Sequence, residues 1–167
     1  MSVLWIVLLL VAAQRLAELV YARRNTRYLL AEGAYEVGAA HYPFLVAVHA
    51  LWLLSLALFI PAETQPVWWL LGVFVVLQAL RLWVLATLGR FWTTRIITLP
   101  GAPLVRRGPY RFLRHPNYLV VAGEIAVLPL AFGAWEIAVI FSLANAAVLA
   151  WRIRCEERAL IGRPLAR

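Results

Sequence analysis

Long apolar stretches alternate with short polar segments along this chain. Five apolar stretches cover residues 2–21, 42–60, 67–88, 117–132 and 135–151. The first three are close to the ~20 residues that a helix needs to cross a bilayer. The last two are shorter, and only Gly133 and Ala134 separate them, so we expect them to form a tight helical hairpin. The pattern predicts an all-α integral membrane protein with about five transmembrane helices.

Arginines are distributed unevenly over the segments that connect these stretches. Segment 61–66 and the turn at 133–134 carry none, whereas segments 22–41 and 89–116 and the C-terminal tail are rich in arginine. Cytoplasmic connections of membrane proteins are enriched in basic residues. The distribution therefore predicts that the N-terminus lies outside and the C-terminus lies in the cytoplasm, with the polar chemistry on the cytoplasmic face.

Composition supports this membrane assignment. Hydrophobic residues make up 64% of the 167 residues and charged residues only 14%, against about 45–50% and about 25% in soluble domains. The net charge is +8, which in a soluble chain would suggest nucleic-acid binding. Here the arginines flank apolar spans and no nucleic-acid motif is present, so we expect no nucleic-acid partner. We expect residues 1–167 to form a single membrane domain.

Charged side chains also occur within the predicted spans, where they are costly unless they are paired or functional. Arg15 and Glu18 lie three residues apart, so they share a helix face and can pair; a structural pair or a snorkelling arginine is the favoured interpretation. Glu124 has no basic neighbour on its own helix. It therefore needs a partner from elsewhere, such as Arg81, Arg152 or a bound cation, and we include it among the candidate cofactor-binding residues.

The histidines and the single cysteine predict no metal site. His41, His49 and His115 lack the spacing of metal ligands, and Cys155 is the only cysteine. Within its span, His49 is expected to be a packing residue, because a lone histidine there is more often hydrogen-bonded than catalytic. His41 lies at the edge of a connection, where we expect it to meet solvent or ligand.

The connection at 89–116 is unusually long for this chain and ends in the segment RRGPYRFLRHPNYL (106–119). Pro116 is well suited to the first position of a helix. The unpaired N–H groups of that helix would form an anion site with Arg111 and Arg114. Nearby aromatic rings could stack on a base. The ligand indicated is an anionic group linked to an aromatic base, such as S-adenosylmethionine or a nicotinamide dinucleotide; a loop held against lipid headgroups is the alternative.

A second charged segment, WRIRCEERAL (151–160), follows the last span. Arg152 and Glu156 are four residues apart and share a helix face. The segment is interpreted either as a charged rim over a cofactor or as a solvated helix end.

The segments GPYRFLRHPNYLVVAGE and RIRCEERAL, with an apolar hairpin between them, resemble the isoprenylcysteine carboxyl methyltransferase family of integral-membrane methyltransferases. They are also similar in pattern to phospholipid N-methyltransferases. Further segments, QRLAELVYARRN, GAYEVGAAHYPF and LGRFWTTRIITLPGAPLVRRGPYR, resemble a short bacterial branch often paired with type III polyketide synthases. That branch O-methylates alkylpyrones and related phenolic lipids. Family members often continue past Glu-Glu with Phe-Gly and spaced tyrosines, whereas IGRPLAR here counts against a prenylcysteine acceptor.

The resemblance implies a site formed mainly by residues 89–167 and S-adenosylmethionine as cofactor. It implies Arg152 and Glu156 near the transferred methyl group, as the candidate catalytic residues. The candidate cofactor-binding residues are Tyr110, Arg114, His115, Asn117, Tyr118, Glu124 and Glu157. No Gly-x-Gly-x-x-Gly is present, so we do not expect a soluble Rossmann mode of binding.

Methyl transfer from a sulfonium needs alignment and exclusion of water more than acid–base machinery. We therefore expect Arg152 to orient an anionic acceptor oxygen and Glu156 to fix Arg152. A lipophilic acceptor, such as an alkylpyrone or alkylresorcinol, would enter from the bilayer of a bacterial inner membrane, and membrane lipid is the other expected partner. The alternatives are a phospholipid N-methyltransferase, an NADPH-dependent membrane reductase of the sterol reductase type, or a small transporter.

Overall fold

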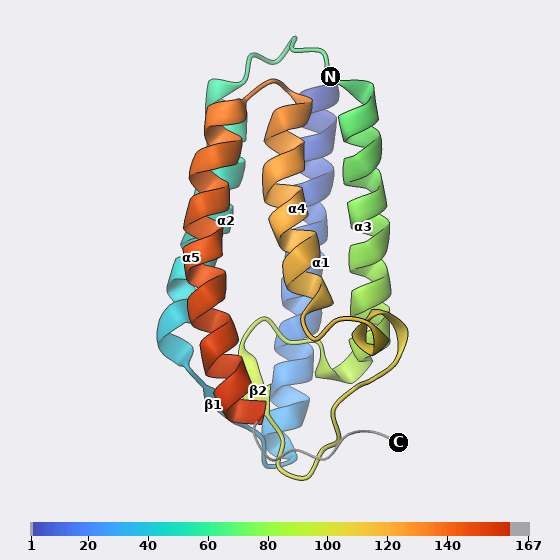
Figure 1. Cartoon of the computed structure of the whole chain (residues 1–167), viewed down its shortest axis with the longest axis vertical. Helices are drawn as coiled ribbons and strands as arrows, with labels where there is room; N and C mark the ends of the chain where they lie inside the picture. The colour runs from blue at the N-terminus through green and yellow to red at the C-terminus, as the bar shows by residue number, and fades with distance from the viewer. Residues whose placement is uncertain (1, 161–167) are drawn as a thin grey trace.

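The computed structural model describes residues 2–160 as a bundle of five long helices with a small two-stranded sheet at one end (Figure 1). The five α-helices are α1 (Val3–Ala31), α2 (Tyr42–Phe59), α3 (Trp68–Leu88), α4 (Pro116–Ala131) and α5 (Trp135–Leu160). Three 3₁₀ helices, η1 (Ala39–His41), η2 (Gly89–Phe91) and η3 (Gly108–Arg111), lie in the connections. The strands are β1 (Tyr35–Val37) and β2 (Ile96–Thr98). The predicted all-α membrane class is confirmed.

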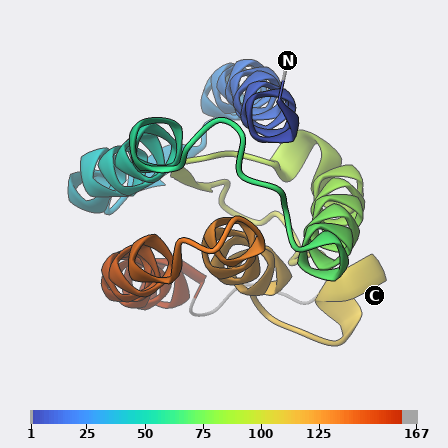
Figure 2. The same ribbon diagram turned by 90° about the horizontal axis from the view of Figure 1, so that it is seen from above.

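Four of these helices, all except α4, are long and apolar enough to cross a membrane. α4 has 16 residues, which at ~1.5 Å per residue is shorter than a typical hydrocarbon core. α4 and α5 lie side by side, joined by the short turn at 132–134 (Figures 1 and 2). Many large apolar side chains of the helices are exposed, among them Leu10, Leu58, Phe59 and Leu143. Such a surface fits lipid rather than water as its solvent.

α1 and α5 extend well past the apolar stretches that predicted them. The last turns of α1 bury Ala22, Asn25 and Leu29, a spacing that places them on one helix face. Asn25 Nδ2 donates hydrogen bonds to the carbonyl oxygens of Gly89 (3.0 Å) and Trp92 (2.9 Å). The extension therefore holds the start of the long connection after α3.

The two strands pair antiparallel, with Tyr35 opposite Thr98 and Val37 opposite Ile96. This pairing was not predicted from the sequence, because each strand has only three residues and no clear alternation. The pairing joins the connection after α1 to the connection after α3. It thereby fixes the loops that carry the polar residues.

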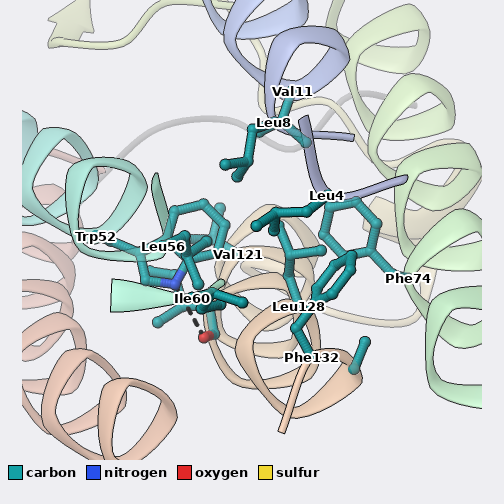
Figure 3. Packing of buried hydrophobic residues seen from close by; sticks show 12 residues of the cluster. Leu4, Leu8, Val11, Trp52, Leu56, Ile60, Phe74, Val121, Leu128 and Phe132 are labelled. Carbon is teal, nitrogen blue, oxygen red and sulfur yellow. Dashed lines mark hydrogen bonds between the residues drawn. The ribbon is translucent and has the colours of Figure 1, made fainter. Parts of the chain in front are cut away.

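The hydrophobic core occupies the end of the bundle that holds the N-terminus (Figure 1). Its buried side chains come from α1–α4 and the adjoining turns (Figure 3), and Ile137 and Phe141 of α5 pack against them partly buried. Trp52 is its largest fully buried side chain, and its Nε1 donates a hydrogen bond to the carbonyl oxygen of Ile125 (3.2 Å). The segments without arginine, 61–67 and 132–134, close this end, and the strands, η3 and the arginine-rich segments lie at the other (Figure 1). The structure thus places the basic segments at one end. The tail IGRPLAR lies outside the described residues.

Candidate active site

A cavity of about 980 Å³ lies at the arginine-rich end of the bundle. Its walls come from three segments: residues 88–98 after α3, residues 103–118 leading into α4, and residues 152–158 of α5. Every candidate residue from the sequence except Glu124 lines it. Those residues are Tyr110, Arg114, His115, Asn117, Tyr118, Arg152, Glu156 and Glu157.

The beginning of α4 forms one wall of this cavity. Pro116 is the first residue of the helix, as predicted. The first turns of a helix leave N–H groups without intrahelical partners and carry the positive end of the helix dipole. The rings of His115 and Tyr118 stack with centroids 5.1 Å apart and an angle of 13° between their planes. This wall therefore combines flat aromatic faces with a positive helix end.

Arg152 is held at two of its three nitrogens by hydrogen bonds inside the protein. Its Nε donates to the Tyr118 hydroxyl oxygen (2.7 Å), and its Nη1 donates to the Thr94 carbonyl oxygen (2.8 Å). The Tyr118 hydroxyl in turn donates to a Glu156 carboxylate oxygen. The predicted link between Arg152 and Glu156 thus runs through Tyr118. No hydrogen bond from Nη2 is found within residues 2–160.

The acidic residues of α5 face the histidine at the start of α4. His115 Nδ1 is 3.9 Å from a Glu156 carboxylate oxygen, and His115 Nε2 is 3.9 Å from a Glu157 carboxylate oxygen. Burial and the charge of Glu156 raise the pKa of Tyr110 above its ordinary range, so its phenol stays protonated. Within the described part of the chain, the buried atoms Asn117 Oδ1 and His115 Nε2 have no hydrogen-bond partner. Asn117 Oδ1 can therefore accept from a ligand donor, and His115 Nε2 can donate to or accept from a ligand according to its tautomer.

Residues 70–162 match the isoprenylcysteine carboxyl methyltransferase (ICMT) family. The chain belongs to this family. Its members are membrane methyltransferases that use S-adenosylmethionine as methyl donor. The match covers both the cavity-lining connection and the charged end of α5.

Two bacterial proteins are similar over almost their whole length. The uncharacterized protein YpbQ of Bacillus subtilis is 41% identical over 160 residues, which is 93% of this chain and 95% of YpbQ. An uncharacterized protein of Haemophilus influenzae is 27% identical over 157 residues, 90% of each chain. No solved structure is significantly similar to the chain.

Glu124 lies apart from the cavity of this ICMT family member, in a buried cluster of charges between α1, α3 and α4. Its carboxylate accepts hydrogen bonds from Arg15 (2.7 Å), Arg81 (3.2 Å) and Gln78 (2.9 Å). Arg81 also binds both carboxylate oxygens of Glu18, at 2.7 and 2.6 Å. The predicted pair of Arg15 and Glu18 is present at 3.3 Å. Arg81, named as a possible partner of Glu124, is thus one of two arginines that neutralise it.

Two further residues, His41 and Thr94, contact Arg152 beside the cavity. His41 Nε2 lies 3.2 Å from Arg152 Nη1, and the Thr94 carbonyl accepts from the same nitrogen. The expectation that His41 meets solvent or ligand is wrong, because its side chain is 1% exposed and does not line the cavity. No local signal links these residues, since His41 and Arg152 are 111 positions apart.

Residues 2–160 contain no group of three or more metal-ligating side chains.

Proposed function

We propose that this protein is an S-adenosylmethionine-dependent methyltransferase of the membrane. It transfers a methyl group to an oxygen of a lipophilic acceptor, such as an alkylpyrone or an alkylresorcinol. The observation that carries the proposal is the convergence of two separate charged segments, 110–118 and 152–157, on one cavity beside lipid-facing helices. Family membership supplies the reaction class.

The cavity residues fit S-adenosylmethionine, which carries a carboxylate, an ammonium group, a sulfonium and an adenine. Arg114 and the N-terminus of α4 would hold the carboxylate. Glu157 would face the ammonium group, and the stacked rings of His115 and Tyr118, with Tyr110, would give the adenine a flat surface. Asn117 Oδ1, buried without a partner in the described chain, would accept from a donor of the ligand. When bound, the cofactor supplies a methyl group that is already activated.

Arg152 would orient the acceptor oxygen through its Nη2 group. The other two nitrogens are committed to Tyr118 and Thr94, so the guanidinium is fixed before the acceptor arrives. Glu156 would fix this arrangement through the Tyr118 hydroxyl. An acceptor that enters as a carboxylate or an ionised enol or phenol needs no general base, and alignment supplies most of the rate. Water is excluded on the side of Arg152, which is only 7% exposed.

The membrane setting supports a lipophilic acceptor. The cavity lies where the exposed apolar helices meet the arginine-rich end, so an alkyl tail can stay in the bilayer while its polar head reaches Arg152. We place this end in the cytoplasm on the positive-inside rule, in the inner membrane of a bacterium. The cofactor-binding part is about residues 89–167, and residues from both ends of its described part line the cavity.

The test is incubation of the purified protein with labelled S-adenosylmethionine and a bacterial membrane lipid extract, followed by identification of the labelled product. A labelled alkylpyrone or alkylresorcinol ether is the expected result. Labelled N-methylated phosphatidylethanolamine would instead assign phospholipid N-methylation. Titration calorimetry with both cofactors is the companion measurement: binding of NADPH without binding of S-adenosylmethionine would overturn the proposal. The Arg152→Ala protein is the control and should bind the cofactor without turnover.

A further inference from the structure

We propose that His41 is a positioning residue for Arg152, holding the guanidinium so that Nη2 is presented to the methyl acceptor. The inference rests on the proposed function, because it gives Arg152 the task of orienting the acceptor oxygen. His41 does not line the cavity, so it acts through Arg152 and touches neither cofactor nor acceptor.

The contact dictates the chemical state of His41. An arginine carries only donors and stays charged in proteins. The ring nitrogen facing Arg152 Nη1 at 3.2 Å must therefore accept, which requires that Nε2 of His41 has no proton. A neutral imidazole with an unprotonated Nε2 carries its proton on Nδ1. The geometry thus needs one tautomer of a neutral His41.

The segment that carries His41 packs against α5 on both sides of Arg152. Gly38, the residue before η1, has a positive φ of 64°, and a Cβ added there would lie 3.0 Å from Cys155 Cβ and 3.2 Å from its Sγ. The His41 ring meets the Trp151 ring edge-on, with centroids 6.2 Å apart. Trp151 and Cys155 flank Arg152 along the helix. His41 is therefore held against α5 at the height of Arg152.

Thr94 adds a second set of contacts that hold Arg152. The hydroxyls of Tyr42 and Thr94 lie 3.2 Å apart, and the Thr94 carbonyl shares Arg152 Nη1 with His41. Nη1 of Arg152 is thus held by two separate segments, through His41 and Thr94, while Tyr118 holds Nε. Without the His41 acceptor, one N–H of Nη1 is left without a partner in a buried place, and the guanidinium can turn away from the acceptor.

Two substitutions separate the acceptor role of His41 from its packing role. His41→Gln keeps an oxygen that can accept near the position of Nε2 but loses the ring. His41→Phe keeps a ring against Trp151 but has no acceptor. If His41 positions Arg152, the Gln protein retains most of its kcat for an alkylpyrone acceptor. The Phe protein then loses ~10- to 100-fold in kcat, as misplaced catalytic groups do, with an unchanged affinity for S-adenosylmethionine.

The opposite pattern would overturn the inference: a Phe protein with wild-type kcat, or a Gln protein as impaired as the Phe protein. Thermal unfolding of each variant shows whether it is folded. If the Phe protein does not fold, the ¹⁵N spectrum of the wild-type imidazoles tests the contact instead, with the Gln protein identifying the His41 signals. A proton on Nδ1 and none on Nε2 at neutral pH supports the inference, and any other state refutes it.

Failure of the proposed function would look different from failure of this inference. If wild-type protein transfers no methyl group from S-adenosylmethionine to any lipid, the proposed function is wrong, and the imidazole spectrum still tests the contact. If the wild type is active and the Phe protein equals it, only the role of His41 is wrong.

Discussion

Arg152 owes its orientation to the planar fork of its guanidinium. The side chain reaches Tyr118 with one nitrogen and both Thr94 and His41 with another. A lysine ammonium is a compact point charge and cannot span these partners. We therefore expect Arg152→Lys to lower kcat by about 10²- to 10³-fold, the range seen when one preorganised donor is lost, while cofactor affinity changes little.

Steady-state kinetics with an alkylpyrone acceptor and calorimetric titration of S-adenosylmethionine check this expectation. Arg23→Lys, at an exposed position on α1, is the matched control for the chemistry of the substitution. A Lys protein that turns over at the wild-type rate would show that charge alone, rather than the fork, is what the site needs.

Titration of the Tyr110 phenol makes the free energy of unfolding depend on pH in the alkaline range. Its pKa is raised from the ordinary value of 10.0 by burial and by the charge of Glu156. In the unfolded chain the phenol therefore loses its proton at a lower pH than in the folded protein. The folded state then binds more protons, so the free energy of unfolding falls as pH rises above about 10.

We expect Tyr110→Phe to reduce this fall, because the substitution removes the phenol that titrates differently in the two states. Thermal unfolding in detergent at several values between about pH 9 and 11 measures it. Tyr28→Phe, which removes an exposed phenol, is the control. Identical pH slopes for the wild type and the Tyr110→Phe protein would contradict the expectation.

At the scale of elements, the close packing of η3 against α3 depends on Gly108. Gly108 has a φ of 55°, and an added Cβ would lie 2.6 Å from Thr87 Oγ1. The Thr87 hydroxyl is not free to move aside, since it donates to the Trp83 carbonyl oxygen (2.7 Å). Tyr110 follows two residues later, so the position of η3 against α3 determines where Tyr110 meets the cavity.

Gly108→Ala should therefore push η3 away from α3, lowering both the melting temperature and the affinity for S-adenosylmethionine. Gly101→Ala is the matched control: Gly101 also has a positive φ, 74°, but a Cβ there meets nothing within 4 Å. Both variants carry backbone strain of about 1–3 kcal/mol, and only Gly108→Ala adds the clash. Equal cofactor affinities in the two variants would show that the position of η3 against α3 does not affect the cofactor site.

At the scale of the whole molecule, the buried charges couple α1, α3 and α4. Two arginines and two glutamates, Arg15, Arg81, Glu18 and Glu124, form a cluster whose formal charges balance. Removing one charge from such a cluster leaves another unpaired in a poorly solvated place. We expect Glu124→Gln to destabilise the protein by about 3–5 kcal/mol, measured by thermal unfolding in detergent.

The double variant Glu124→Gln with Arg15→Gln restores charge balance and should recover part of the lost stability. Cofactor titration of the folded Glu124→Gln protein tests the sequence prediction that Glu124 belongs to the cofactor site. A loss of cofactor affinity without loss of stability would favour that prediction over the structural role of the cluster.

Much of the whole fold followed from sequence alone because the bilayer imposes it. Helix number, the α4–α5 hairpin and the gathering of arginines at one end depend on hydropathy and charge, which are read locally. The start of α4 at Pro116 followed from the backbone geometry of proline. The segments at 110–118 and 152–157 were singled out by their own residues, a helix start beside arginines and aromatic rings and a charged helix end, and the resemblance to a family of membrane methyltransferases added the roles of single residues.

Tertiary structure alone decided which of these residues meet. It brings His41 to Arg152 across 111 positions and Glu124 to Arg15 across 109, and no periodicity encodes such separations. It also decided that Glu124 faces two arginines away from the cavity and that His41 is buried. The physical reason is that a polar group inside a membrane bundle must find its partner on another helix, and helix packing determines which partner lies within reach.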